Sequence, residues 1–165
     1  MKKHPILNQE QIKHKIRRIA YQIYESNIEE KEVIIAGIAK NGFQLAGKIE
    51  EELTQISPLK VHLCKVEIDK KNPRGTITTS LSSDEYQDKS IILVDDVLNS
   101  GTTLIYGVRH FLEVPLKQFR TAVLVDRNHK KYPVKADFKG LSLSTSLSET
   151  VKVTLDESNE KVELS

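Results

Sequence analysis

The stretch IILVDDVLNSGTT, residues 91–103, places two adjacent carboxylates directly after a short apolar run. Residues 91–94 are apolar without interruption, which predicts a buried strand. Asp95 and Asp96 follow this strand at once. Neighbouring carboxylates beside a buried strand repel each other and lose hydration, a cost that no fold requires. The pair therefore indicates a site that holds a ligand.

The second half of the stretch predicts an anion site. It supplies the small polar residues Asn99, Ser100, Gly101, Thr102 and Thr103 at a turn before a predicted helix, Thr103 to Leu112. Backbone N–H groups of such a turn, together with the partial positive charge of a helix N-terminus, bind a phosphate well. No lysine follows Gly101, so the turn differs from the glycine-rich loop that binds triphosphates.

A phosphate would be repelled by Asp95 and Asp96, so a neutral or cationic group must contact them. A vicinal diol suits this position, because each carboxylate can accept a hydrogen bond from one hydroxyl. A nearby Mg²⁺ ion would relieve the repulsion further. A diol beside a monophosphate describes a ribose 5-phosphate.

The flanking sequence predicts one α/β domain over residues 1–165. Apolar runs at 33–38 and 119–126 and an alternating pattern at 59–68 predict further strands, and apolar residues at helical spacing predict helices at 9–26 and 43–56. Strands that alternate with helices predict a parallel sheet covered on both faces. The loops after three of these strands should meet at one sheet edge, where such sheets bind ligands; they are 39–42, 95–103 and 127–138.

Residues 69–90 are polar and contain Pro73 and Gly75, which predicts a long, mobile loop with a hairpin through Thr76 to Ser80.

The composition has 38% hydrophobic residues, 29% charged residues and a net charge of +2, which is typical of a globular domain and not of a strongly basic nucleic-acid binder. The single cysteine, Cys64, excludes an internal disulfide. We find no apolar run long enough for a membrane helix and no secretory signal, so we expect a cytoplasmic protein without a membrane partner.

VDDVLNSGTT resembles the signature of the type I phosphoribosyltransferases, which bind phosphoribosyl diphosphate (PRPP). VIIAGIAKNGFQLA resembles the strand-turn-helix that grips the diphosphate in that family. Two further stretches, RRIAYQIYE and the C-terminal part from AVLVDRNHKKYPVKADF onward, are similar to one subgroup, the pyrimidine-operon regulators that are also uracil phosphoribosyltransferases. The resemblance implies a mostly parallel twisted sheet flanked by helices, with a small hood over the base.

The resemblance also implies site residues. Asp95 and Asp96 would be catalytic and would hold Mg²⁺, the turn Asn99 to Thr103 would bind the 5-phosphate, and Ala39, Lys40, Asn41 and Gly42 would bind the diphosphate. Base-binding residues would be Arg127, Val134 and Phe138. Phe138 is equally well explained as a core residue. Family members form homodimers or homotetramers, and the same is expected here.

This chain departs from the subgroup at several positions. Gly101-Thr102-Thr103 replaces Gly-Arg-Thr, Lys40-Asn41-Gly42 replaces Thr-Arg-Gly, and Tyr21 replaces a histidine implicated in RNA contact. The 69–90 loop lacks the Tyr-Arg-Asp-Asp segment, and Lys70, Lys71 and Arg74 are the cations that could meet the diphosphate instead.

The departures bear on the base. Purine salvage enzymes carry aspartate at position 99, and Asn99 cannot act as a general base. We therefore expect transfer to uracil, with two alternatives: a UMP- or UTP-sensing, RNA-binding regulator with weak or no catalysis, and a 6-oxopurine phosphoribosyltransferase. RNA is the disfavoured partner because of the modest net charge.

Overall fold

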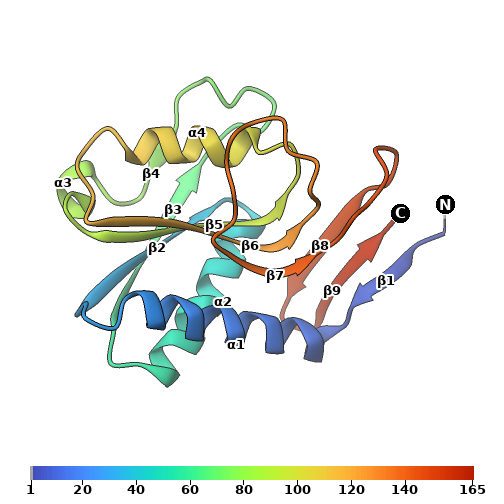
Figure 1. The fold of residues 1–165 in the computed structure, drawn as a ribbon, viewed down its shortest axis with the longest axis horizontal. Helices are drawn as coiled ribbons and strands as arrows, with labels where there is room; N and C mark the ends of the chain where they lie inside the picture. The colour runs from blue at the N-terminus through green and yellow to red at the C-terminus, as the bar shows by residue number, and fades with distance from the viewer. Residues whose placement is uncertain (1) are drawn as a thin grey trace.

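The computed structural model describes residues 2–165, which form two sheets and four helices. The larger sheet is mixed, with its strands in the spatial order β4-β3-β2-β5-β6-β7. All of them run parallel except β4, which pairs antiparallel with β3 at one edge (Figure 1). This topology confirms the predicted mostly parallel α/β sheet. The strands are β2 (Glu32–Ile38), β3 (Lys60–Glu67), β4 (Thr78–Thr79), β5 (Ser90–Leu98), β6 (Gln118–Asp126) and β7 (Phe138–Ser142).

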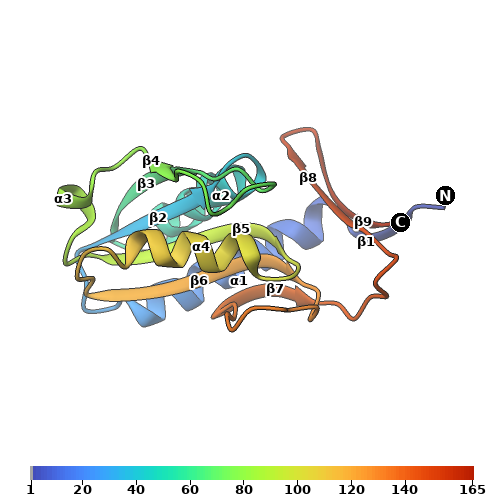
Figure 2. The same ribbon diagram turned by 90° about the horizontal axis from the view of Figure 1, so that it is seen from above.

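Helices cover both faces of this sheet. Helices α1 (Gln9–Ser26) and α2 (Asn41–Ile56) pack on one face, and α4 (Thr102–Phe111) packs on the other (Figures 1 and 2). The β2 strand shows why: its side chains alternate, so that Val33 and Ile35 join the core under α1 and α2, whereas Ile34 and Ala36 join the core under α4. A strand that is buried on both sides reads as a continuous apolar run, as the sequence showed.

A second, three-stranded antiparallel sheet forms the hood. It consists of β1 (His4–Leu7), β8 (Val151–Asp156) and β9 (Asn159–Leu164), in the order β1-β9-β8. The hood lies beyond the carboxyl ends of the parallel strands (Figure 1). Its buried side chains, among them Leu7, Val153 and Val162, belong to the same apolar cluster as α1 and α2. One core therefore extends from the main sheet into the hood.

The segment 69–90 is more ordered than the sequence indicates. Thr79 of β4 pairs with Val66 of β3, so the expected hairpin is formed with the preceding strand. A short helix, α3 (Ser83–Tyr86), follows. Tyr86 is buried, its ring lies 4.9 Å from the ring of Phe111, and its hydroxyl donates to Glu113 at 2.9 Å. The end of this segment is thereby fixed beneath α4.

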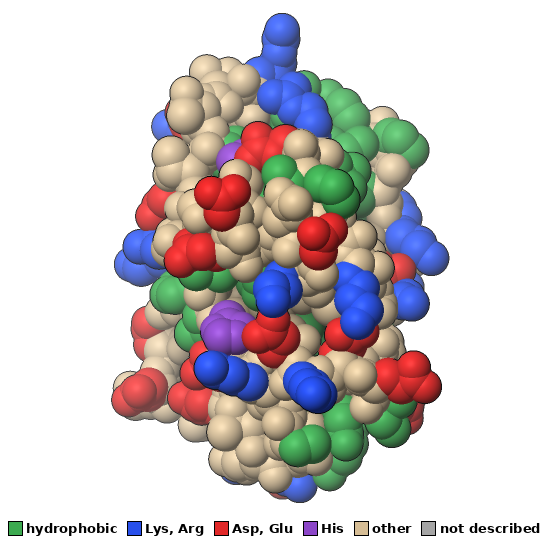
Figure 3. Space-filling view, turned by 90° about the vertical axis from the view of Figure 1, so that its left-hand side faces the viewer, with side chains coloured by type: hydrophobic (Ala, Val, Ile, Leu, Met, Phe, Trp, Pro, Cys, Tyr) green, Lys and Arg blue, Asp and Glu red, His purple; other side chains and the backbone are tan. Residues whose placement is uncertain are grey.

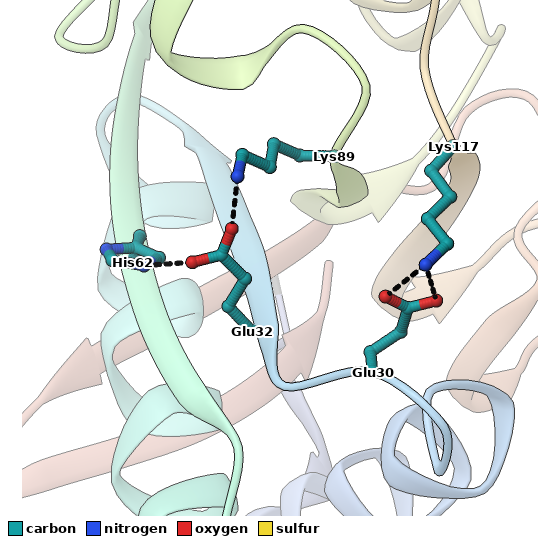
Figure 4. A network of polar contacts seen from close by, with 5 residues as sticks. All are labelled: Glu30, Glu32, His62, Lys89 and Lys117. Atoms are coloured by element: carbon teal, nitrogen blue, oxygen red, sulfur yellow. Dashed lines mark hydrogen bonds and ion pairs between the residues drawn. The ribbon is translucent and has the colours of Figure 1, made fainter.

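The amino ends of the parallel strands carry charges of both signs in close alternation (Figure 3). Glu32, the first residue of β2, accepts from Lys89 and lies 3.2 Å from His62, and Lys117 pairs with Glu30 at 2.8 Å (Figure 4). Lys89 and then His62 hold the pKa of Glu32 below its usual range. This face therefore presents no field of a single sign. No helix within residues 2–165 is long and apolar enough to cross a membrane.

Candidate functional site

An open pocket lies at the carboxyl end of β5, between the main sheet and the hood. Its volume is about 180 Å³. The acidic pair and the whole polar turn line it together with a lysine and several apolar residues: Lys70, Asp95, Asp96, Val97, Leu98, Asn99, Ser100, Gly101, Thr102, Thr103, Leu104, Val123 and Val151. The structure therefore brings the two halves of the opening stretch to one cavity, at the edge of the sheet where parallel strands place ligands.

The two aspartates lie inside strand β5, not after it. The strand continues to Leu98 because its pairing with β6 continues, with Asp95 opposite Val123 and Val97 opposite Val125. As a result both carboxylates are held on a rigid element and are nearly buried, at 3% and 9% exposed. Such a pair is preorganised to receive hydroxyls or a cation without further ordering.

Burial raises the pKa of Asp95 to about 8, and the neighbouring charge of Asp96 contributes in the same direction. The ammonium of Lys70 opposes this shift from 3.5 Å. Lys70 reaches the site from the segment after β3, whereas Lys71 and Arg74 of the same segment are exposed and do not line the pocket. A ligand that brings positive charge or hydroxyl donors would stabilise the ionised form of Asp95.

Asn41, the first residue of α2, connects the acidic pair with the hood. Its amide nitrogen donates to Asp96 at 3.0 Å and to the backbone oxygen of Val153 at 3.1 Å. The next residue is glycine for a steric reason, since a Cβ on Gly42 would lie 2.7 Å from the backbone oxygen of Val94. The turn Ala39–Gly42 is thus held against β5, although it does not line the pocket itself; its Ala39–Lys40 peptide bond is cis.

Gly101 determines the shape of the anion turn. Its φ is +88°, a left-handed conformation, and a Cβ there would lie 2.7 Å from Val134 Cγ1. Gly101 is the N-cap of α4, so the N-terminus of this helix opens toward the pocket. The hydroxyls of Ser100 and Thr102 lie 2.7 Å apart, and both line the cavity. Hydroxyls and a helix N-terminus in this arrangement are chemically suited to an anion.

The predicted base-binding residues do not line the pocket. Val134 packs on Gly101 from the far side, and Arg127 is 9% exposed, with its guanidinium occupied by protein acceptors. Phe138 pairs with Ala122 near the middle of β6 and packs in the core on the α1 and α2 face. This burial agrees with the interpretation of Phe138 as a core residue, and its stacking on a base stays a prediction.

Two residues that line the pocket, Lys70 and Val151, were not firmly identified from the sequence alone. Lys70 was one of three candidate cations, and only its contact with Asp95 singles it out. Val151 opens β8 and forms part of the pocket wall. The alternating pattern of TVKVTL predicts a strand. The pattern alone does not indicate that this strand lies next to the acidic pair.

The donor set suits Mg²⁺ bound jointly with a substrate. Within residues 2–165 no group of three or more histidine, cysteine or acidic side chains could hold a metal on its own. Mg²⁺ commonly binds one or two carboxylates and completes its shell with phosphate oxygens and water. Asp95 and Asp96 can supply such a pair, and the raised pKa of Asp95 is a reason for a cation to bind there.

Comparisons with known proteins agree with this geometry. The phosphoribosyl transferase domain family matches residues 4–158. The protein named bifunctional protein PyrR is 36% identical in Streptococcus thermophilus and 35% identical in Streptococcus pneumoniae; each match spans 162 residues, 95% of this chain and 92% of the relative.

Solved structures show the same fold. The hypoxanthine phosphoribosyltransferase of Trypanosoma cruzi superimposes with a TM-score of 0.82 at 16% identity, over 97% of this chain and 94% of that one. A hypoxanthine-guanine phosphoribosyltransferase of Bacillus anthracis gives 0.78 at 19% identity, over 98% and 96%. The chain therefore belongs to the phosphoribosyl transferase domain family.

Proposed function

We propose that this chain transfers the 5-phosphoribosyl group of PRPP to a nucleobase, with uracil preferred and UMP and diphosphate as products. One observation carries the proposal: a buried pair of carboxylates and a glycine-centred anion turn line the same pocket. A ribose 5-phosphate needs those two kinds of group side by side. The relatives named PyrR favour a pyrimidine, whereas the structural neighbours named for hypoxanthine share under 20% identity and support the fold alone.

In this proposal each part of the substrate has its own partner. The backbone N–H groups and hydroxyls of Asn99 to Thr103 bind the 5-phosphate, and Asp95 and Asp96 accept hydrogen bonds from the ribose hydroxyls. The turn Ala39–Gly42, with Asn41 already bonded to Asp96, lies next to the diphosphate. The ammonium of Lys70 lies 3.5 Å from Asp95, next to the acidic pair.

The reaction replaces the bond between the anomeric carbon and diphosphate with a bond between the same carbon and the base. The bond from that carbon to the diphosphate oxygen breaks, its electron pair leaves with the diphosphate, and positive charge builds on the ribose ring. The two aspartates stabilise that charge from fixed positions. Mg²⁺ bound at Asp95 and Asp96 would supply charge neutralisation for the leaving group. The ring nitrogen of the base forms the new bond and gives its proton to solvent.

An assay of nucleotide formation tests this function. The protein would be incubated with PRPP, Mg²⁺ and each of uracil, hypoxanthine, guanine, xanthine, adenine and orotate. UMP as the main product is the expected result. Formation of IMP or GMP with higher kcat/KM would assign a 6-oxopurine instead. No product with any base would refute the enzymatic proposal.

A second function rests on the relatives' name, which is bifunctional protein PyrR. The same pocket would hold UMP, since a nucleoside monophosphate also offers a diol and a phosphate, and nucleotide binding could control association with RNA. RNA affinity that depends on several phosphate contacts falls steeply with salt. Binding measured at about 50 and 200 mM salt, with and without UMP, tests this role. Light scattering on the same samples tests assembly as a homodimer or homotetramer.

A further inference from the structure

Asn99 forms a hydrogen bond with Arg127 at the side of the pocket. The Nη1 atom of Arg127 donates to Oδ1 of Asn99 over 2.9 Å. Asn99 is exposed and lines the cavity, whereas Arg127 is buried behind it. The pair therefore joins a pocket-lining side chain to a fixed support.

This contact determines which end of the Asn99 amide faces a ligand. A guanidinium has only donors, so the amide atom next to it must be the oxygen. The amide is planar, and its NH₂ group is directed away from Arg127. Among residues 2–165, no protein atom accepts a hydrogen bond from that nitrogen. The Asn99 side chain thus presents an N–H donor away from Arg127, while its oxygen is held by the guanidinium.

Arg127 itself cannot easily turn away. Its Nε donates to Thr145 Oγ1 at 3.0 Å, and its Nη2 donates to the backbone oxygens of Ser146 at 3.3 Å and Glu149 at 2.6 Å. These acceptors belong to the segment that leads into β8, where Val151 forms part of the pocket wall. Asn99 is therefore linked through Arg127 to the segment that leads into the hood, and its orientation depends on the position of that segment.

We propose that Arg127 is a positioning residue that fixes Asn99 as a hydrogen-bond donor to a carbonyl oxygen of the nucleobase. The inference rests on the proposed transferase function and names a specificity determinant within it. Uracil carries the carbonyl oxygen O2 next to its nucleophilic N1, and negative charge grows on O2 as N1 loses its proton. A fixed donor stabilises that charge.

The same donor acts against a base that presents an N–H group at this position. A neutral 6-oxopurine can attack through N9 only in the tautomer in which N9 carries no proton. In that tautomer the imidazole proton is on N7. If N7 faced Asn99, two donors would meet, and neither would be satisfied. Sites built for one hydrogen-bonding pattern discriminate strongly against the opposite pattern.

The substitution Asn99→Asp tests the proposal, because a carboxylate keeps the contact with Arg127 but offers the pocket an acceptor. We expect kcat/KM for uracil to fall about tenfold or more, and the uracil-to-hypoxanthine ratio of kcat/KM to fall at least as far. The new charge lies in the anion turn and can weaken PRPP binding for every base alike, so the dissociation constant of PRPP is measured by calorimetry and the base ratio, in which that effect cancels, decides the test.

Arg127→Lys tests the positioning role with the charge retained. Lysine lacks the planar fork that holds several acceptors at once, so the Asn99 amide becomes free to rotate. We expect a lower uracil-to-hypoxanthine ratio and a higher KM for uracil, with the wild-type Kd for PRPP. Ser148→Ala is the matched control, since Ser148 lies in the same segment and its hydroxyl forms a hydrogen bond with the hydroxyl of Ser146, not with Arg127; it should behave as wild type.

The outcomes separate this inference from the proposed function. An unchanged base ratio in Asn99→Asp would overturn it. PRPP affinity weakened about tenfold or more together with an unchanged base ratio would assign the Asn99 side chain to the phosphate alone. If the wild type makes no nucleotide, the transferase proposal fails, and ligand binding tests the inference instead. Asn99→Asp should then weaken UMP binding more than ribose 5-phosphate binding, and an equal effect on both ligands would refute the inference.

Discussion

Asp95 holds its proton into the neutral pH range, because burial and the adjacent Asp96 raise its pKa to about 8. In the unfolded chain the same group ionises near pH 3.9. Between these two values the folded state binds more protons than the unfolded state, so the stability contributed by protonated Asp95 is complete below about pH 4. It is lost progressively as the pH rises toward about 8.

Asp95→Asn should remove this dependence, since the amide resembles the protonated acid at every pH. Relative to wild type, the Tm of the variant should therefore rise as the pH is raised from 5 to 9. Thermal melts of both proteins across that range, without ligand, measure the difference. A difference between the two Tm values that stays constant with pH would show that Asp95 is already ionised at pH 5.

Asp96→Asn should leave folding intact and reduce turnover at least about a hundredfold, the usual scale for a key electrostatic group. The substitution removes the negative charge that would face the ribose ring. Steady-state kinetics with PRPP and uracil measure the loss. Asp156→Asn in β8 changes an exposed carboxylate of the hood and is the control for a general charge effect. Equal activity of the two variants would contradict the role of Asp96.

Much of the site could be predicted at this scale. The aspartates and the turn are contiguous in sequence, so their proximity needs no knowledge of the fold. Arg127 is different, because its partners Thr145, Ser146 and Glu149 become neighbours only after β7 and the following segment fold back. The guanidinium of Arg127, which the sequence predicts to contact the base, instead donates hydrogen bonds to acceptors within the protein.

The start of helix α4 depends on Gly101, the glycine at its N-cap. Gly101→Ala forces a Cβ into left-handed backbone and to within 2.7 Å of Val134 Cγ1, so we expect a loss of about 1–3 kcal/mol in unfolding free energy. Gly47→Ala is the matched control inside α2, where an added Cβ meets nothing within 4 Å. It should stabilise the protein by about 0.5–1 kcal/mol. Urea unfolding measures both, and equal effects would show that the turn tolerates a side chain.

Among the elements, long and strongly patterned segments were predicted and short ones were not. Helix α1 runs from Gln9 to Ser26 as its isoleucine spacing indicates, and β2 and β6 match their apolar runs. Helix α3 has four residues, too few to show a period, and its formation depends on Tyr86 packing under α4. Strand β5 extends past the predicted end because pairing with β6 outweighs the polarity of the aspartates.

The whole molecule should unfold as one unit. Val162, in the central strand of the hood, is fully buried in the cluster that also contains Ile35 of β2 and Ile49 of α2. Val162→Ala should therefore lower the stability of the entire chain by about 2 kcal/mol in a single transition. Circular dichroism and tyrosine fluorescence should report the same midpoint. Two separate transitions would show that the hood is an independent domain and would refute the single-domain prediction for residues 1–165.

At this scale the sequence indicates the sheet type but not the pairing of distant segments. Continuous apolar strands between helices are enough to predict parallel order and the ligand edge. Strand β1 shows no such pattern: its four residues, HPIL, form a strand only because β9 lies beside them, with His4 opposite Leu164. That contact spans nearly the whole described chain and has no local signal.

The pairing of β1 with β9 also has a consequence for how the protein is made. Residues 4–7 are synthesised before every other element described here, yet their partner follows more than a hundred and fifty positions later. The parallel sheet has all its strands once Ser142 has emerged, whereas the hood must wait for Leu164. During synthesis the strand with the acidic pair is thus available before β8, whose Val151 forms part of the pocket wall, and the pocket is completed only after the parallel sheet.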